Sequence, residues 1–348
     1  MNYIGTDVHI STLNFKVVND SGKIKMANEV QTSAMNFMTF IKSVPKPRQV
    51  IIEEGPLAAW LLEMCVENKE QLVITDPKQN HWIGGSGKKE DAIDAEKLAQ
   101  LGRGGFVKEI HHPTGQRRRF RELVQAYHNT NKSIVRVKNQ IKAKFLQNGI
   151  ACLGQTVYLP NHRAAWRKKM PQESALRVIV DSYWKELDQV ENSLETILKE
   201  IKLESKGYPE IKLIDEIPGV GFIIAMTIVA ILETPHRFAD KRKVWAYSGF
   251  GINKKSSANK IYSEKLGKEY NRLLKCVVEE AALAAINADN DNAFRLNYLE
   301  MTIKKGIAPQ RAKLTIARDV IATAWAMWKK EEHYNPEIDR KLKIEVEV

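Results

Sequence analysis

Two long stretches of the chain repeat apolar residues at alternating intervals of three and four, the spacing of a helix that packs lengthwise against another helix. In the first stretch the repeat consists of Phe120, Val124, Tyr127, Ile134, Ile141 and Phe145, with Asn131 and Lys138 at the off-pattern positions. The second stretch has no interruption and consists of Leu176, Val180, Tyr183, Leu187, Val190, Leu194, Ile197 and Ile201. We therefore expect residues 106–206 to form two long heptad helices that make an antiparallel coiled coil or a subunit interface.

The two stretches carry opposite charge. Residues 117–144 contain nine Lys or Arg against one acid, Glu122, whereas residues 173–204 contain eight acids and four bases. The nine basic residues are Arg117, Arg118, Arg119, Arg121, Lys132, Arg136, Lys138, Lys142 and Lys144. A helix of this charge density favours a polyanion, so these side chains are candidates for binding DNA or RNA. The alternative is a solvated face that the acidic stretch neutralises.

The first 105 residues alternate strand and helix patterns. Strands are expected over residues 1–18, 23–30, 49–53 and 71–75, and helices over 33–44, 56–68 and 90–101. The turn residues 19–22, Asn-Asp-Ser-Gly, predict a hairpin between the first two strands. This order predicts a mixed α/β domain over residues 1–105.

The last third of the chain is expected to be an all-helical domain over residues 207–330, followed by a charged tail over 331–348. Helices are predicted around residues 217–225, 241–251, 268–288 and 308–330, with a polar loop that reaches to about residue 267. The three segments before the tail therefore read as an α/β domain, a pair of long helices and a helical domain.

Composition excludes several classes of protein. The longest apolar stretch, residues 217–232, is interrupted by Pro218, Gly219 and Gly221 and is shorter than the roughly 20 residues of a membrane-spanning helix. The three cysteines are far apart and have no zinc-site spacing. The first residues lack a signal-peptide pattern. We expect a cytoplasmic, nucleoid-associated protein without membrane partners, and its net charge of +12 favours polyanions.

Four acidic residues stand out in the α/β domain. Asp7 lies inside the first predicted strand, and Glu53 ends another. Asp91 and Asp94 are three residues apart on a predicted helix, which places them on one face. Oxygen ligands of this kind hold Mg²⁺ in sites for phosphoryl transfer. The alternative for Asp91 and Asp94 is a pair of solvated helix charges.

The positions of these acids resemble three motifs of one known family. The motifs are Gly5-Thr-Asp7-Val-His9, Val50-Ile-Ile-Glu53-Glu-Gly-Pro56 and Lys89-Glu-Asp91-Ala-Ile-Asp94-Ala95. They are similar to the acidic motifs of the insertion sequence family 110 transposases and their Piv/MooV invertase relatives. Further motifs follow in the same order: Ile217-Pro-Gly-Val-Gly221, Tyr247-Ser-Gly-Phe250, Ser256-Ser257 and Lys265-Leu-Gly267 with Arg272. The resemblance covers nearly the whole chain.

This resemblance implies a fold and a chemistry. The first domain would have a fold similar to ribonuclease H and Holliday-junction resolvases. Asp7, Glu53, Asp91 and Asp94 would coordinate Mg²⁺ or Mn²⁺, and a serine of the C-terminal loop would attack a DNA phosphodiester to form a phosphoserine intermediate. The family serine usually precedes a glycine, which aligns here with Ala258, so Ser257 is preferred and Ser256 stays open.

The same resemblance implies partners. A structured non-coding RNA of the element would guide the enzyme to target and donor DNA, and a dimer or tetramer would coordinate the strand exchanges. Gly219 and Gly221 resemble a helix-hairpin-helix turn that meets a phosphate through backbone N–H groups. The alternative is a tight, closely packed turn. Lys265 and Arg272 are further candidates for phosphate contacts, with a structural salt bridge as the alternative for Arg272.

Three functions are consistent with these features. The first is a site-specific DNA transposase or recombinase that uses Mg²⁺ and a serine nucleophile. The second is a resolvase-type nuclease that uses water and needs only the four acids. The third is a non-catalytic DNA- or RNA-binding descendant, which the altered serine loop motivates.

Overall fold

The computed structural model describes residues 1–77, 91–172, 175–257 and 260–336; for residues 91–93 and 253–264 it describes the backbone only. The chain divides into two compact units, Met1–Arg119 and Phe120–Val348. We refer to them as unit 1 and unit 2 and describe each by itself. Among the described helices, none has both the length and the apolar composition needed to cross a membrane.

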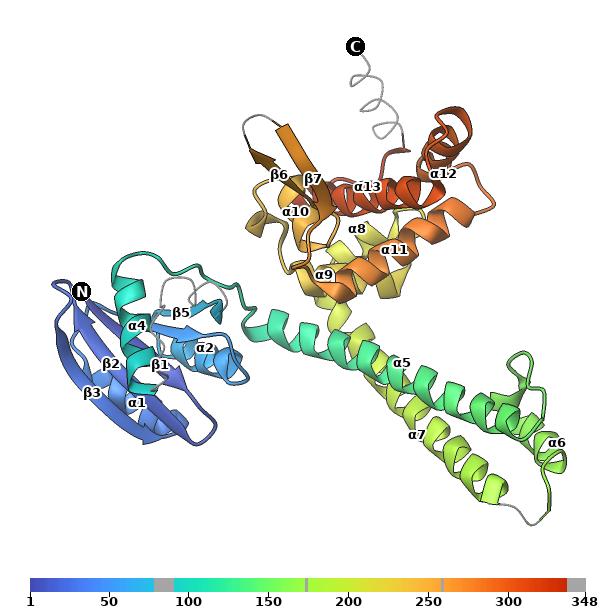
Figure 1. Ribbon diagram of the computed structural model, residues 1–348, viewed down its shortest axis with the longest axis horizontal. Coiled ribbons are helices and arrows are strands. Elements are labelled where there is room, and N and C mark those ends of the chain that lie inside the picture. Colours follow the sequence, from blue (N-terminus) through green and yellow to red (C-terminus); the bar gives the residue numbers. More distant parts are fainter. Residues whose placement is uncertain (78–90, 173–174, 258–259, 337–348) are drawn as a thin grey trace. The chain divides into compact units, whose positions relative to one another are not determined.

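Unit 1 contains a five-stranded sheet with the strand order β3-β2-β1-β4-β5 (Figure 1). The strands are β1 (Asn2–Val8), β2 (Thr12–Asn19), β3 (Ile24–Gln31), β4 (Arg48–Glu53) and β5 (Leu72–Thr75). β2 is antiparallel to both β1 and β3, whereas β4 is parallel to both β1 and β5. The carboxyl ends of β1, β4 and β5 therefore lie at the same end of the sheet.

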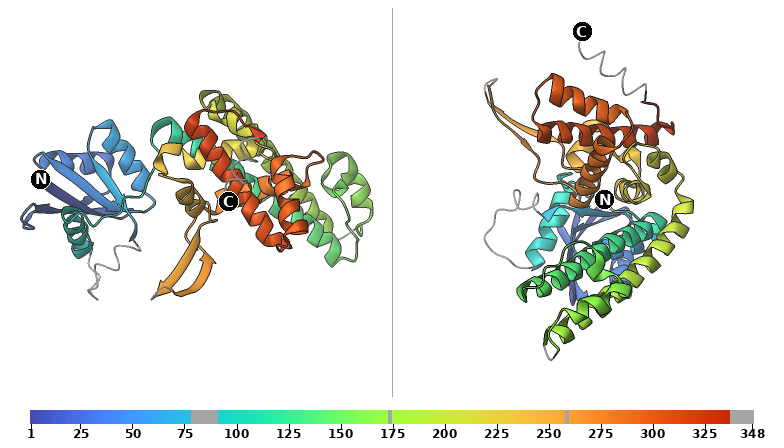
Figure 2. Two further views of the ribbon diagram at one scale, coloured as in Figure 1. Left: turned by 90° about the horizontal axis from the view of Figure 1, so that it is seen from above. Right: turned by 90° about the vertical axis from the view of Figure 1, so that its right-hand side faces the viewer.

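Helices cover both faces of this sheet (Figure 2). They are α1 (Ala34–Ser43), α2 (Ala58–Glu67) and α4 (Asp91–Arg103). α1 and α2 pack against one face, where Ile4, Phe15 and Ile52 join their buried side chains in one apolar core. α4 lies on the opposite face, against Gly5 and Ile51. Side chains alternate between the two faces along each strand, so Asp7 is on the same face as Gly5.

The expected single strand over residues 1–18 was wrong, because this stretch forms both β1 and β2. A tight turn separates them: His9 N donates to Thr12 O at 2.9 Å, and Val8 pairs with Leu13. The alternation of apolar residues runs on through the turn because Ile10 lies at its tip, where it is exposed. The hairpin predicted at residues 19–22 is confirmed as the connection from β2 to β3.

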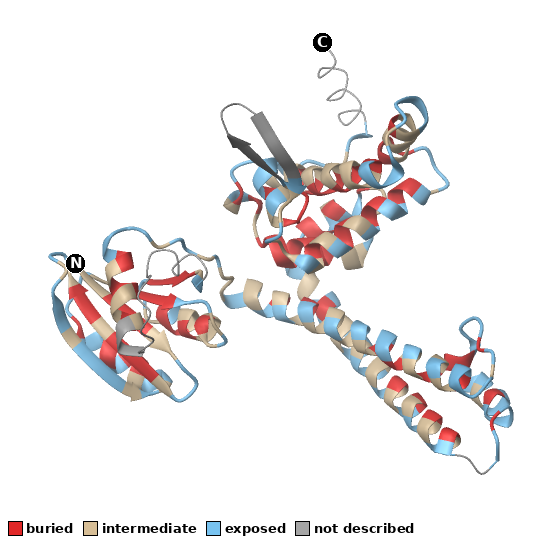
Figure 3. Cartoon of the chain, viewed as in Figure 1, coloured by how far each residue is buried: buried red, intermediate tan, exposed pale blue. Residues whose placement is uncertain are grey.

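Unit 2 contains an arm of two long helices, α5 (Gly115–Gln147, which begins in unit 1) and α7 (Ala175–Glu204). They lie side by side and run in opposite directions (Figure 1). Figure 3 shows buried residues along their facing sides. Between them the chain forms η1 (Thr156–Tyr158), η2 (Pro160–His162) and α6 (Arg163–Lys168). The two long helices expected from the apolar repeats are therefore present.

The apolar repeat predicts only some of the side chains that are buried between the two helices. Ile134, Ile141 and Phe145 are buried as expected, but Val137 and Trp184 are buried too, and neither belongs to the expected repeat. Trp184 lies beside Tyr183, the expected position, and its indole Nε1 donates to Val157 O at 2.8 Å. Trp184 is therefore buried against the segment between the helices, while Tyr183 packs against the same core and is only partly buried.

The rest of unit 2 is a helical core with α9 (Phe222–Leu232) at its centre. Every α9 residue from Ala225 to Leu232 is buried, as expected for a helix that is apolar on all sides. The surrounding helices are α8 (Glu210–Asp215), α10 (Lys241–Tyr247), α11 (Arg272–Asn287), α12 (Ala293–Leu299) and α13 (Pro309–Lys330), with the short turns η3 (Ser205–Gly207), η4 (Pro235–Arg237) and η5 (Glu300–Lys304).

The expected all-helical domain also contains a β-hairpin, which corrects the expected polar loop. Strands β6 (Ile252–Ser257) and β7 (Lys260–Leu266) pair in antiparallel fashion. Lys, Asn and Ser dominate β6, so its sequence lacks the apolar alternation by which strands are recognised. The hairpin forms because each strand satisfies the backbone hydrogen bonds of the other.

Candidate active site

Asp7 and Glu53 lie at the carboxyl ends of adjacent parallel strands. The register of β1 and β4 pairs Thr6 with Ile52, and each acid is the next residue of its strand. Ile51 contacts α4 and is two residues before Glu53, so the pleat directs Glu53, like Asp7, to the face that α4 covers. Two carboxylates from separate strands therefore share one end and one face of the sheet.

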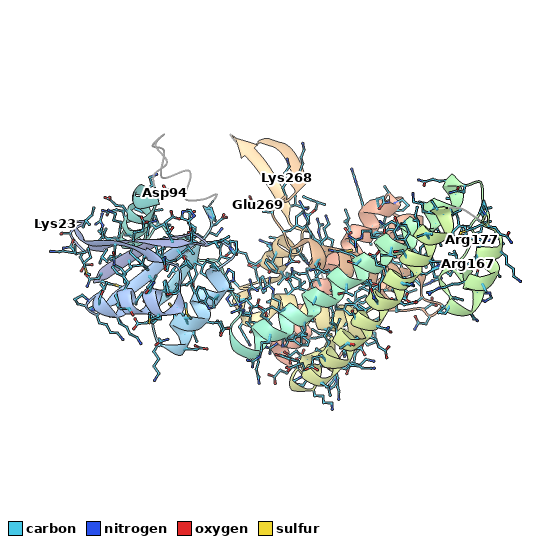
Figure 4. The ribbon with its side chains drawn as sticks, turned by 90° about the horizontal axis from the view of Figure 1, so that it is seen from below. Lys23, Asp94, Arg167, Arg177, Lys268 and Glu269 are labelled. Atoms are coloured by element: carbon cyan, nitrogen blue, oxygen red, sulfur yellow. The ribbon has the colours of Figure 1, made fainter. Side chains whose placement is uncertain are left out.

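α4 brings Asp94 to the same end of the sheet. A Cβ atom added to Gly5 would lie 1.9 Å from Ala95 O, so the backbones of β1 and α4 are in direct contact there. Gly102, two turns further along, lies against Tyr3, and Arg103 Nη1 donates at 3.4 Å to Asp20 O, next to the amino end of β1. α4 therefore starts near the carboxyl ends of the strands and runs toward their amino ends. Figure 4 labels Asp94 near the start of α4.

We call the group of Asp7, Glu53 and Asp94 the acidic end. Asp91 is the first residue of α4, and its side chain lies outside the described residues. The backbone nevertheless places residue 91 one helical turn before Asp94. All four predicted acids thus belong to elements that meet at one end of the sheet.

Two basic side chains contact the acidic end. His9 Nε2 lies 3.0 Å from Asp7 Oδ2, and Lys97 Nζ lies 3.0 Å from Asp94 Oδ1. Beside it, His112 and Glu54 form a further pair at 2.5 Å. The sequence assigns no site role to His9, Lys97 or His112, whereas Glu54 is an alternative to Glu53, which the Glu-x-Gly-Pro pattern favours. His9 and Lys97 are close in sequence to their carboxylates, but residues 54 and 112 are far apart, and no local pattern connects them.

The acidic end fits a divalent cation by its chemistry. Carboxylate oxygens are the ligands that Mg²⁺ prefers, and Mg²⁺ usually takes only one or two of them and keeps several waters. Within the residues whose side chains are described, no three His, Cys, Asp or Glu form a complete metal cluster. The carboxylates of the acidic end thus have the chemistry of ligands for a divalent cation.

The predicted serines lie on the hairpin of unit 2. Ser256 pairs with Ile261 and Ser257 with Lys260, at the end of β6 next to the connection between the strands. Their side chains lie outside the described residues. The backbone therefore places both serines toward the tip of the hairpin. Their positions do not favour one serine over the other as the nucleophile.

The root of this hairpin is held by the helical core. Phe250 N donates to Trp245 O at 2.7 Å, and Gly267 N donates to Gly251 O at 3.0 Å. Arg318 of α13 donates from Nε to Phe250 O at 2.8 Å. Beside the root, Lys268 and Glu269 are labelled in Figure 4. The core thus fixes the direction in which the hairpin leaves it.

Lys265 and Arg272 flank the root and are both exposed. Lys265 belongs to β7, and Arg272 is the first residue of α11. Within the described part of the chain, Arg272 has no ion pair, so the salt-bridge alternative finds no support there. Both residues stay candidates for phosphate contacts.

Several of the nine basic residues have acidic partners. The pairs are Arg118–Glu63 at 3.8 Å, Arg121–Glu233 at 2.5 Å, Arg136–Glu186 at 3.6 Å and Lys138–Glu191 at 2.9 Å. Glu233 is buried, so the contact of Arg121 is structural. The pairs to Glu186 and Glu191 neutralise part of α5 with α7, as the solvated-face alternative expects.

The remaining basic residues differ in exposure. Arg119 and Lys132 are exposed, while Arg117, Lys142 and Lys144 are half-buried. Lys144 Nζ also donates to Gln147 Oε1 at 3.2 Å. Arg119 and Lys132 are therefore accessible to a polyanion, as is Arg136 beside Glu186.

The glycine turn before α9 is closely packed. A Cβ atom added to Gly219 would lie 2.3 Å from Ala281 O of α11, and the backbone φ of Gly219 is +84°. Both observations explain this glycine by the tight-turn alternative. Gly221 is the exposed N-cap of α9, and no atom would contact an added Cβ atom within 4 Å. Gly221 therefore stays a candidate for a phosphate contact.

Comparison with known proteins gives the same family for both units. Residues 4–148 match the DEDD transposase model of IS110 elements, and residues 211–298 match the model of the IS116/IS110/IS902 transposase family. The chain is also similar to the transposase for insertion sequence element IS1111A of Coxiella burnetii (strain RSA 493 / Nine Mile phase I). The two are 20% identical over 249 residues, which are 71% of this chain and 68% of the relative.

These matches include the features described above. The first covers the acidic end, and the second covers the helical core from α8 to α12 together with the serine hairpin. The similarity to the Coxiella burnetii transposase extends over most of the chain. This chain therefore belongs to the IS110 family of insertion-sequence transposases, and it is a DNA transposase.

Proposed function

We propose that this transposase exchanges DNA strands at specific sites with a divalent metal, Mg²⁺ or Mn²⁺, at the acidic end of unit 1. Asp7, Glu53, Asp91 and Asp94 are its ligands, on a fold of the ribonuclease H type. The observation that carries this proposal is the position of Asp7 and Glu53 on neighbouring parallel strands, on the face against which α4 packs.

The carboxylates and the side chain that contacts one of them have different roles at this site. Bound metal would neutralise charge on the phosphate and lower the cost of attack. Asp7 and Glu53 present oxygen ligands from fixed strand ends. His9 holds Asp7 in one orientation through their 3.0 Å contact, as the partners of ligating carboxylates do in other sites.

Ser257, or Ser256, supplies the nucleophile. A serine hydroxyl is weak at its free pKa and needs a base or a metal to become reactive. Attack of its oxygen on the phosphorus forms a phosphoserine bond and releases the cut strand with a free 3′ or 5′ hydroxyl. The hairpin root, held by Phe250 and Arg318, limits the positions that the serine can occupy.

The family and the exposed charge support the choice of partners. An element-encoded RNA guides the protein to DNA. Phosphates of the RNA or of the DNA are contacted by four exposed residues, Arg119, Lys132, Lys265 and Arg272. The paired arm helices act as a coiled coil that assembles a dimer or tetramer, so that several strands are exchanged together. In this scheme residues 1–105 are catalytic, 106–206 serve assembly and binding, and 207–330 carry the serine.

The proposal is tested by replacing Asp7 with Asn. This variant keeps the size of the side chain and removes a charged ligand, so we expect DNA cleavage to fall by at least about 100-fold. Mn²⁺ binding, followed by electron paramagnetic resonance, should weaken as well, while affinity for the element's DNA and RNA stays within about twofold.

Asp20→Asn is the matched control, because Asp20 lies in the turn at the other end of the sheet. It should cleave and bind Mn²⁺ like the wild type. Wild-type rates and unchanged Mn²⁺ affinity in Asp7→Asn would show that the acidic end is not the metal site.

A further inference from the structure

Two exposed apolar side chains, Ile10 and Met35, lie near the turn that follows the strand of Asp7, and we call them the apolar tip. Ile10 lies in the turn between β1 and β2 and is 85% exposed. It follows Asp7 by three residues, so their Cα atoms are at most about 11 Å apart. Met35, in the first turn of α1, is 74% exposed. Among the large apolar side chains in the described part of unit 1, none is more exposed than these two.

The tip is rigidly held. His9 N donates to Thr12 O at 2.9 Å, which closes the turn around Ile10. Thr32 holds both sides of the turn: its Oγ1 donates to His9 O at 2.8 Å, and its N donates to Ser11 O at 3.0 Å. Met35 follows Thr32 by three residues, so it lies close in sequence to the residue that holds the turn around Ile10.

The residue type at this position is unusual for a turn. Turns are mostly formed by Gly, Pro, Asn, Asp and Ser, whose conformations or side-chain hydrogen bonds suit them. A single exposed apolar residue on a surface has no meaning by itself. Here the exposed isoleucine lies in a turn that hydrogen bonds hold in place. The turn begins at His9, which contacts the proposed ligand Asp7.

The size of the apolar tip limits what it can contact. A stable protein interface buries about 800 Å² on each partner, and two isolated side chains with polar neighbours such as His9 and Ser11 supply far less. Proteins that distort nucleic acid need only one or two apolar side chains, commonly Ile, Leu, Met or Phe, which enter between neighbouring bases. The tip therefore suits a base step better than a protein surface.

We propose that Ile10, supported by Met35, is a wedge that unstacks the DNA bases next to the phosphate held at the acidic end. This inference rests on the proposed function of that end. Unstacking frees the backbone from the regular duplex path, so the phosphate can turn toward the carboxylates. Ile10 acts on the shape of the substrate and takes no part in the bond-making step.

The first test measures unstacking directly. 2-Aminopurine, whose fluorescence rises when it loses its stacking neighbours, is placed at each position around the cut site of the element's junction DNA. The full-length protein and the flanking non-coding RNA are added with Mg²⁺, and every protein carries Ser256→Ala/Ser257→Ala, so that the metal stays bound and no strand is cut. The wild type should raise the fluorescence at one step beside the cut site, and Ile10→Ser should leave it at the level of free DNA although the DNA stays bound.

The second test asks whether a weakened duplex replaces the wedge. With Mg²⁺, Ile10→Ser should cut fully paired DNA about 10- to 100-fold more slowly than the wild type. A mismatch at the same step should restore most of that rate, because the bases are then already unstacked. Ile10→Met should retain the wild-type rate, which separates the apolar contact from any effect on the turn.

Ile303→Ser is the matched control, since Ile303 is 74% exposed and lies in unit 2. It should behave as the wild type in both tests. Equal fluorescence and cleavage in Ile10→Ser and Ile303→Ser would overturn the wedge. So would a loss in Ile10→Ser that no mismatch restores. If the wild type itself neither binds nor cuts DNA, the proposed function fails instead.

Discussion

Gly5 allows the backbone of α4 to lie directly on β1. A Cβ atom at residue 5 would lie 1.9 Å from Ala95 O and 2.5 Å from Ala99 N, and these backbone atoms can move only with the whole helix. Asp94 immediately precedes Ala95. A residue without a side chain thus sets the distance between β1, which carries Asp7, and α4, which carries Asp94.

Gly5→Ala should therefore displace α4 and damage both stability and activity. Overpacking of a tight contact costs about 1–3 kcal/mol, so hydrogen exchange in β1 and α4 peptides should become faster. DNA cleavage should fall more than nucleic-acid affinity does. Gly207→Ala is the control, since an added Cβ atom there meets no atom within 4 Å; equal exchange in the two variants would contradict this account of Gly5.

His128 provides a test of packing between α5 and α9. Its Nε2 lies 2.8 Å from Thr227 Oγ1, and Thr227 donates to Ile223 O, so the histidine is the donor. Burial, assisted by Lys132, lowers the pKa of His128 below its ordinary value of 6.5. The unfolded chain thus takes up a proton at a higher pH than the native protein does.

The stability from neutral His128 should therefore be complete above about pH 6.5 and decline as the pH falls below it. His128→Gln, which can still donate to Thr227, should lose less Tm than the wild type between about pH 7.5 and pH 5.5. Scanning calorimetry at a series of pH values measures this difference. An identical decline in both proteins would show that His128 does not report this packing.

At the scale of elements, α5 combines two roles that its sequence does not separate. Its basic residues look alike in the sequence, yet Arg121 contacts buried Glu233, which also lies 3.7 Å from Arg237. Arg136 and Lys138 face acids of α7. Arg119 and Lys132 are exposed. The carboxylates that pair with these basic residues belong to parts of the chain distant in sequence, so the sequence of α5 does not show which residues are paired.

These two kinds of residue should respond differently to substitution. Arg121→Met removes one of the positive charges beside the buried carboxylate of Glu233. The free energy of unfolding of unit 2 should therefore fall by about 2 kcal/mol. The double variant Arg119→Glu/Lys132→Glu should keep its stability and bind nucleic acid more weakly. The slope of log affinity against log salt should become shallower by about 0.9 for each lost phosphate contact.

Urea denaturation and a salt titration of binding measure the two effects. The account of α5 would be contradicted if Arg121→Met kept its full stability, or if the double variant showed an unchanged salt slope. The second result would leave α5 as a solvated face that α7 neutralises.

At the scale of the whole molecule, local patterns predict the parts well and their contacts less well. The strand that carries Glu53, the helix that carries Asp94 and the two long arm helices follow from periodicity and turn residues, whereas the strand that carries Asp7 ends at Val8 and not at residue 18. The pairing of His112 with Glu54 and the burial of Trp184 depend on residues distant in the sequence. Polar β6 becomes a strand only because β7 pairs with it.

The central proposal is that strand exchange requires both the acids of unit 1 and a serine of unit 2. The most direct measurement is a denaturing gel of protein, flanking RNA and supercoiled DNA with the element junction, run with Mg²⁺ or EDTA. We predict a covalent protein–DNA band that requires Mg²⁺, disappears in Ser256→Ala/Ser257→Ala and is absent in Asp7→Asn. Nicked DNA without a covalent band, equally abundant in the double serine variant, would contradict the claim and indicate a nuclease that uses water.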